Sequence, residues 1–210
     1  MTFPQENDKR HIDLLSVSRL PLLLKQLYKD PVPPTTEAII SFVFQKSEEM
    51  FCDFPGLYEH LRPKQLTQAV TLTRATLFEI RILCVALASA MLPDGKVPKE
   101  CGEHIISILR ELAVMEYLNS TRYSEEFDRL YAVTAERGLR YGKHLHDTTK
   151  LINLLYQNLS WAKTDSIKEP SERAVLTGGF IDHYFAESVL RQLLVRYVEH
   201  FASFVNRTFP

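Results

Sequence analysis

The chain has 210 residues, enough for one substantial domain that buries roughly 70% of the surface its unfolded form exposes. Its 45% hydrophobic and 24% charged residues are typical of a globular protein, and only seven glycines argue against a turn-rich all-β design. The 25 basic and 26 acidic side chains nearly cancel, so the chain lacks the basic field that binding to a nucleic-acid backbone needs. Nucleic acid is therefore not an expected partner.

Cysteine usage and hydropathy favour a soluble, cytoplasmic protein. The three cysteines, Cys52, Cys84 and Cys101, are an odd number without CxxC spacing, which fits a reduced compartment. Residues 1–10 carry no apolar run of signal-peptide length. No segment reaches the ~20 apolar residues of a membrane-spanning helix, so no contact with a membrane is expected.

The first quarter of the chain predicts a lead-in followed by two helical segments. Residues 1–10 are polar and are expected to be flexible. The apolar pattern from Ile12 to Leu27 predicts a helical segment that Pro21 kinks or restarts, because proline lacks a backbone donor. A proline-rich connector over 31–34 precedes the next predicted helix, which runs from about Glu37 to Phe51.

A long helix is predicted over about 64–92, because apolar residues recur there at alternating spacings of four and three. This seam consists of Leu66, Val70, Thr73, Leu77, Ile80, Cys84, Leu87 and Met91. The only charged residues between Leu66 and Met91 are Arg74, Glu79 and Arg81. We therefore expect the helix to be mostly buried and covered by the others.

Three further helical regions follow. A helix is expected from Pro98 to about Leu118, and a longer segment from Ser124 to about Trp161. Gly138 and Gly142 weaken the middle of the longer segment, which predicts a bend or a break there. The last helix follows the glycine pair at 178–179 and carries its own seam of apolar residues.

These patterns predict an all-α protein: a single-domain bundle of six or seven helices packed around the central long helix of about 64–92. The domain covers residues 11–210 and follows the flexible lead-in of residues 1–10. The central seam lasts under four heptads, and the last helix supplies a matching one, so an intramolecular bundle is favoured over a coiled coil. Cys84 is expected to be a small core residue, where Tyr197 or Phe201 of the last helix fits.

One short motif carries candidate metal ligands. His146 and Asp147 are adjacent within His-Leu-His-Asp-Thr-Thr-Lys, and this resembles the signature of HD-domain metal-dependent phosphohydrolases. In that family the pair joins an upstream histidine and a downstream aspartate around metal, and here His104 and Asp182 lie in those directions. The resemblance implies metal-assisted hydrolysis, with His146 and Asp147 as catalytic candidates. The alternative interpretation is surface histidines near a helix bend.

A second candidate lies at the start of the last helix. Counting back from Leu190 by three and four reaches Glu187 and His183, a carboxylate and an imidazole one helical turn apart. The two side chains can ligate one metal ion or share a proton. The alternative is that this turn lies at the hydrated end of the bundle, where acidic groups favour a helix N-terminus.

A third candidate combines an arginine with a histidine. Arg137 or Arg140, followed by His144 or His146, is similar to the pair used by HEPN-type ribonucleases. That similarity implies an arginine that holds a phosphate and a histidine that acts as acid or base. It makes Arg140 a further catalytic candidate.

No arrangement of residues requires an enzyme, and no cofactor is predicted. The first interpretation is a non-enzymatic helical interaction or regulatory protein that contacts a protein partner or another copy of itself. It depends on aromatic residues that cover more than one side of the last helix: Tyr184, Phe185, Tyr197, Phe201 and Phe204. Two alternatives stay open: the HD-like phosphohydrolase, and a small-molecule-binding helical regulator, which needs an apolar internal pocket.

Overall fold

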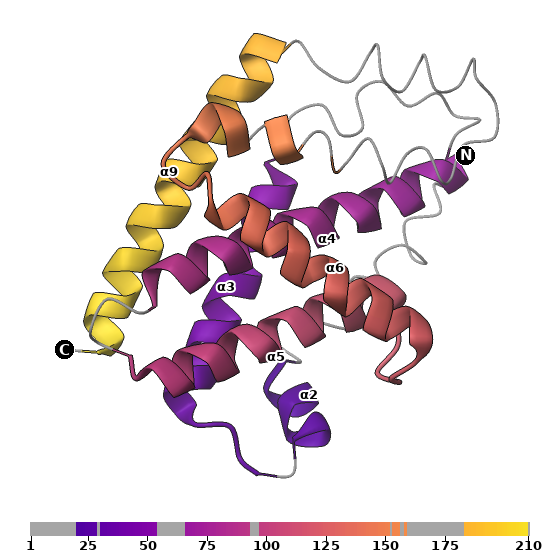
Figure 1. Ribbon diagram of the computed structural model, residues 1–210, viewed down its shortest axis with the longest axis vertical. Coiled ribbons are helices and arrows are strands. Elements are labelled where there is room, and N and C mark those ends of the chain that lie inside the picture. The colour runs from indigo at the N-terminus through magenta and orange to yellow at the C-terminus, as the bar shows by residue number, and fades with distance from the viewer. Residues whose placement is uncertain are drawn as a thin grey trace, which may run out of the picture.

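The computed structural model describes residues 20–28, 30–53, 66–92, 97–151, 153–155, 158 and 183–209. Every regular element in these ranges is a helix, which confirms the predicted all-α class (Figure 1). Six helices are labelled: α2 (Leu20–Leu27), α3 (Pro34–Cys52), α4 (Leu66–Met91), α5 (Lys99–Leu118), α6 (Glu125–Gly142) and α9 (His183–Thr208). A further helical stretch includes 148–151 and 153–155. None of the helices described combines the length and the apolar character that crossing a membrane requires.

Helix α4 crosses the middle of the bundle and contacts α3, α5, α6 and α9, as its seam predicts (Figure 1). The seam side chains Leu77, Ile80 and Cys84 are buried and belong to one hydrophobic core that all six helices share. Full burial of a leucine or isoleucine side chain contributes about 1.5–3 kcal/mol to folding. The seam of α4 from Leu77 onward is thus the centre of the core.

Helix α9 packs against this centre through its aromatic side chains. Tyr197 donates a hydrogen bond from its hydroxyl to the backbone carbonyl of Cys84, at 2.9 Å, which confirms the predicted fit of an aromatic there. The Phe42 ring of α3 lies 5.6 Å from the ring of Phe201 and 4.5 Å from that of Phe204, centroid to centroid. Burial raises the pKa of the Cys84 thiol to about 12, so this cysteine acts as a small core residue.

Local side-chain chemistry sets several helix ends. Helix α3 begins at Pro34, whose missing N–H costs nothing in a first helical turn. The Ser124 side chain accepts a hydrogen bond from the backbone N–H of Phe127 at 3.2 Å and so caps α6. Asn119 ends α5 with a left-handed φ of 52°, a conformation that asparagine tolerates better than most residues.

The long segment expected from Ser124 onward is interrupted at Gly142. Helix α6 ends there, a turn covers 143–146, and a new helical stretch begins at Thr148. Asp147 caps this stretch, because its side chain accepts a hydrogen bond from the backbone N–H of Lys150 at 3.0 Å. The predicted break is therefore confirmed at Gly142, whereas Gly138 stays inside α6.

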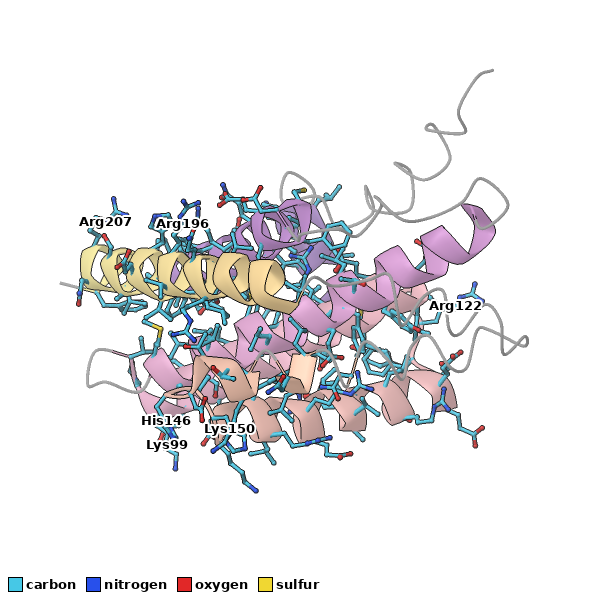
Figure 2. All side chains as sticks on the ribbon, turned by 90° about the horizontal axis from the view of Figure 1, so that it is seen from above. Lys99, Arg122, His146, Lys150, Arg196 and Arg207 are labelled. Atoms are coloured by element: carbon cyan, nitrogen blue, oxygen red, sulfur yellow. The ribbon has the colours of Figure 1, made fainter. Side chains whose placement is uncertain are left out.

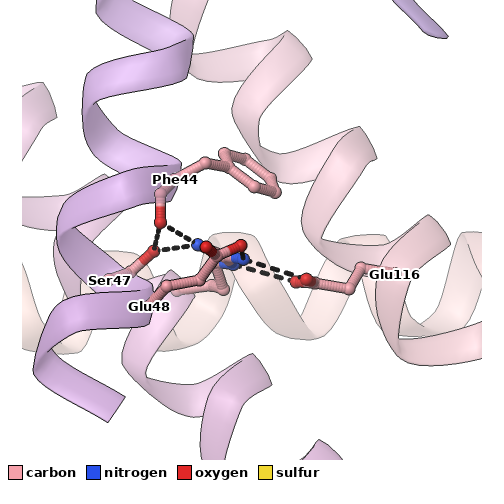
Figure 3. Close-up of polar contacts among 5 residues, drawn as sticks. Phe44, Ser47, Glu48 and Glu116 are labelled. Carbon is pink, nitrogen blue, oxygen red and sulfur yellow. Dashed lines mark hydrogen bonds and ion pairs between the residues drawn. The ribbon is translucent and has the colours of Figure 1, made fainter. Parts of the chain in front are cut away.

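Arg81 of α4 is fully buried and links α3 to α5. Figure 3 labels its partners Phe44, Ser47, Glu48 and Glu116. Its guanidinium donates two hydrogen bonds to the carboxylate of Glu116, at 2.8 and 2.9 Å, and one to Glu48 at 2.9 Å. It also donates to the Phe44 carbonyl and the Ser47 hydroxyl, and it lies 4.1 Å from the centre of the Phe44 ring. These partners replace the water that the buried charge has lost.

Replacing Arg81 by methionine is expected to lower the free energy of unfolding by about 3–5 kcal/mol, because it leaves the Glu116 carboxylate buried without a counter-charge. Urea denaturation measures this loss. The double variant Arg81→Met, Glu116→Leu should recover most of it, since a hydrophobic pair of similar volume has no charge to desolvate.

The matched control is Arg129→Met, which removes an exposed ion pair with Glu126 at 3.9 Å. Its effect should stay within about 1 kcal/mol, because water screens exposed pairs. An Arg81→Met variant as stable as this control would contradict a structural role for the buried ion pair.

Candidate functional site

A cavity of about 550 Å³ lies between α4, α5 and α6. Its walls are mostly small or aliphatic side chains, with few polar groups. The lining residues are Ile82, Val85, Ala86, Ser89, Ala90, Ile106, Arg110, Ala113, Thr134, Ala135, Gly138, Leu139, Gly142, Lys143 and Leu145. Ligand pockets in proteins have this size range and this largely apolar character.

Glycines on α6 keep the cavity open. Gly138 and Gly142 are one helical turn apart and both line it. A Cβ atom placed on either glycine meets no atom within 4 Å, so the space beside them is empty. Leu139 also lines the cavity and is 70% exposed, which leaves an apolar side chain at the mouth. A bound apolar molecule would cover this surface.

The polar groups that the described residues contribute to the cavity are basic or neutral. Arg110 of α5 donates hydrogen bonds to the Thr134 hydroxyl at 2.9 Å and to the Tyr131 carbonyl at 3.0 Å. Its guanidinium also stacks over the Tyr131 ring, 4.1 Å from the centroid. Lys143 is exposed at the end of α6. The lining residues that the structure describes include no aspartate, glutamate, histidine or cysteine. This arrangement suits binding better than acid–base catalysis.

A buried polar cluster holds the neighbouring face of α6 against α4. Glu79 of α4 is 1% exposed and accepts hydrogen bonds from Arg137, from the Tyr141 hydroxyl at 2.5 Å and from the Asn158 amide at 2.7 Å. Burial raises the pKa of the Glu79 carboxyl, although Arg137 and the hydrogen bonds act in the opposite direction. The cluster fixes α6 beside the cavity.

The residues of the HD-like prediction have separate environments. His104 is exposed on α5, with its ring edge-on to Tyr28 at 6.4 Å between centroids. His146 is exposed after α6, and Figure 2 shows it at the surface together with Lys150. The Lys150 backbone N–H lowers the pKa of the Asp147 carboxyl, which serves as a helix cap.

Across the part of the chain that the structure describes, no three histidine, cysteine, aspartate or glutamate side chains come together to hold a metal ion. Asp182 lies outside that part, and the side chains of His183 and Glu187 lie outside it as well. The metal sets that include these residues therefore stay predictions.

The residues of the arginine–histidine prediction also lie in different environments. Arg137 is turned inward and pairs with Glu79, whereas Arg140, three residues further along α6, is exposed. His144 lies in the turn that follows α6, and its backbone N–H donates to the Tyr141 carbonyl at 2.9 Å. The ion pair with Glu79 thus gives Arg137 a structural role within the fold.

Some of the aromatic residues predicted as an interface are buried in the core. Tyr197 and Phe201 are 2% and 0% exposed, and Phe204 is half-buried against Phe42. Packing within the chain accounts for these three side chains without a partner. The side chains of Tyr184 and Phe185 lie outside the described residues.

Sequence reasoning missed Arg110 and the cavity. One signal was present: Ala135, Gly138 and Gly142 follow one another at spacings of three and four, which places a stripe of small residues on one face of a helix. Such a stripe is usual where helices approach closely, so it did not distinguish a contact from a cavity.

No protein-family model matches the chain, and comparisons with curated proteins and with solved structures also find no match. The function is therefore inferred from the side chains of this chain alone. Among them, the lining of the cavity has the composition of a ligand site.

The pH dependence of stability should reflect the ionisation of the Glu79 carboxyl in the buried cluster. Because the folded-state pKa of Glu79 is raised above the ordinary 4.5, the folded protein binds this proton more tightly than the unfolded chain does. The free energy of unfolding of wild type should therefore fall, relative to Glu79→Gln, as the pH rises above the ordinary value of 4.5. Urea denaturation across this range measures the difference.

The control for this experiment is Glu126→Gln, which makes the same carboxyl-to-amide change on the exposed side of α6. Its difference from wild type should stay within about 0.5 kcal/mol throughout. A wild-type stability that rises with pH relative to Glu79→Gln would show that ion pairing outweighs burial at Glu79.

Proposed function

We propose that this chain is a non-enzymatic binding protein that holds an apolar small molecule between α4, α5 and α6. The observation that carries the proposal is the cavity of about 550 Å³ with its mainly aliphatic lining. This corresponds to the small-molecule-binding regulator among the interpretations of the sequence, whose requirement was an apolar internal pocket.

The lining supports binding through the hydrophobic effect. Each CH₂ group moved from water into an apolar site contributes about 0.8 kcal/mol. A ligand of about ten carbons therefore gains on the order of 8 kcal/mol, from which the entropy cost of association is subtracted. The exposed Leu139 at the mouth adds apolar surface that a ligand would remove from water.

A regulatory role is supported by the position of α6. This helix contributes Thr134, Gly138 and Leu139 to the cavity, while its Arg137 and Tyr141 contact Glu79 of α4. A ligand in the cavity would therefore contact α6, the helix that the Glu79 cluster holds against α4. Contact with a protein partner or a second copy stays a prediction, which the molar mass from light scattering tests.

The proposed site is tested with the neutral dye Nile red, whose fluorescence rises in apolar surroundings. Wild type should bind the dye saturably, whereas Gly138→Leu and Gly142→Leu should weaken binding by at least about tenfold, or about 1.4 kcal/mol. The reason is that a leucine side chain at either position enters the open space of the cavity. Both variants should stay folded, because leucine favours a helix over glycine by up to ~1 kcal/mol.

The matched control is Gly102→Leu on α5, since Gly102 also has nothing within 4 Å of an added Cβ but does not line the cavity. This variant should bind the dye as wild type does. A wild type without saturable binding, or a Gly138→Leu variant with unchanged affinity, would contradict the proposed site.

A further inference from the structure

Arg110 is held rigidly at the wall of the cavity. Its Nε donates to the Thr134 hydroxyl and its Nη2 to the Tyr131 carbonyl, so both anchors come from α6. The Tyr131 ring supports the guanidinium plane from one side, at 4.1 Å. The position of this charge is therefore fixed before any ligand arrives, which lowers the entropy cost of binding to it.

Among the residues that the structure describes, no acidic side chain pairs with the charge of Arg110. A guanidinium carries five N–H donors, and the two hydrogen bonds to α6 occupy only part of them. Lys143 adds a second positive charge to the same lining, and none of the lining residues within the described part of the chain is acidic. The described lining is thus apolar, and the two charges that it carries are both positive.

From this complementarity we infer that the ligand is an amphiphilic acid, a hydrocarbon body with one carboxylate that pairs with Arg110. The inference rests on the proposed function, since it names the class of molecule that fills the same cavity. The planar guanidinium fork matches a carboxylate, and charge-assisted hydrogen bonds of this kind are about twice as strong as neutral ones. The aliphatic walls formed by α4 and α6 would cover the hydrocarbon body, with Lys143 near the mouth.

The test compares three ligands of equal chain length: decanoate, decanol and decylamine at neutral pH, each measured by displacement of Nile red. Wild type should bind decanoate at least about tenfold more tightly than decanol, because hydrogen bonds to charged groups contribute more than neutral ones. Decylamine, with a positive charge, should bind most weakly. Equal affinities for decanoate and decanol would overturn the inference.

Variants of Arg110 test whether this residue causes the preference for decanoate over decanol. Arg110→Gln should reduce the decanoate affinity to that of decanol while decanol binding stays within about twofold, since the hydrocarbon contacts are unchanged. Retained decanol binding also shows that the variant is folded. Arg110→Lys, which keeps the charge, should retain part of the preference for the acid. The control Arg140→Gln removes an exposed arginine of α6 outside the cavity and should behave as wild type.

The outcomes separate the two proposals. Binding of Nile red and decanol without a preference for decanoate would overturn the acid ligand and leave the apolar site in place. A decanoate preference that persists in Arg110→Gln would also overturn the role of Arg110. Absence of saturable binding of the dye and of all three ligands would overturn the proposed function itself. If Arg110→Gln fails to fold, the comparison of the three ligands on wild type still decides the class.

Discussion

Two charged side chains in the apolar central helix determine how the other helices are placed. Glu79 and Arg81 are two residues apart on α4, so they point to nearly opposite sides of it. Arg81 is paired with Glu48 of α3 and Glu116 of α5, and Glu79 with Arg137 of α6. A buried charge without partners is far more costly than one with them. The bundle is therefore constrained to the arrangement that supplies both sets of partners.

The cavity follows from how α6 meets α4. Arg137 and Tyr141 reach Glu79 with long side chains, and each is followed in the sequence by a glycine. The cluster thus holds α6 at a distance that large side chains set, while Gly138 and Gly142 leave the adjoining space empty. An unfilled apolar space forgoes dispersion contacts that a packed core would make. Occupation by a ligand would restore those contacts.

Periodicity and turn chemistry were sufficient for much of the fold. The seam of α4 and the break at Gly142 could be read directly, because helix propensity acts over a few residues. The start of α3 was predicted three residues late, at about Glu37, because Pro34 was assigned to the connector although proline fits a first helical turn. The candidate site could not be read in this way. Arg110 gains its role from Thr134 and Tyr131, 24 and 21 residues away along the chain. His146 and Asp147 formed a local pattern that suggested a metal site. In the structure, the Asp147 carboxylate caps a helix.

The sequence by itself determined the all-α class, the central position of α4 and the burial of Cys84 beside an aromatic of α9. These properties depend on the spacing of apolar residues, which is written along the chain. The tertiary structure alone decided that a stripe of small residues borders a cavity and that Arg110 faces it without an acidic partner in the described part of the chain. Those two properties depend on the separation and rotation of neighbouring helices, which long-range ion pairs set and periodicity does not record.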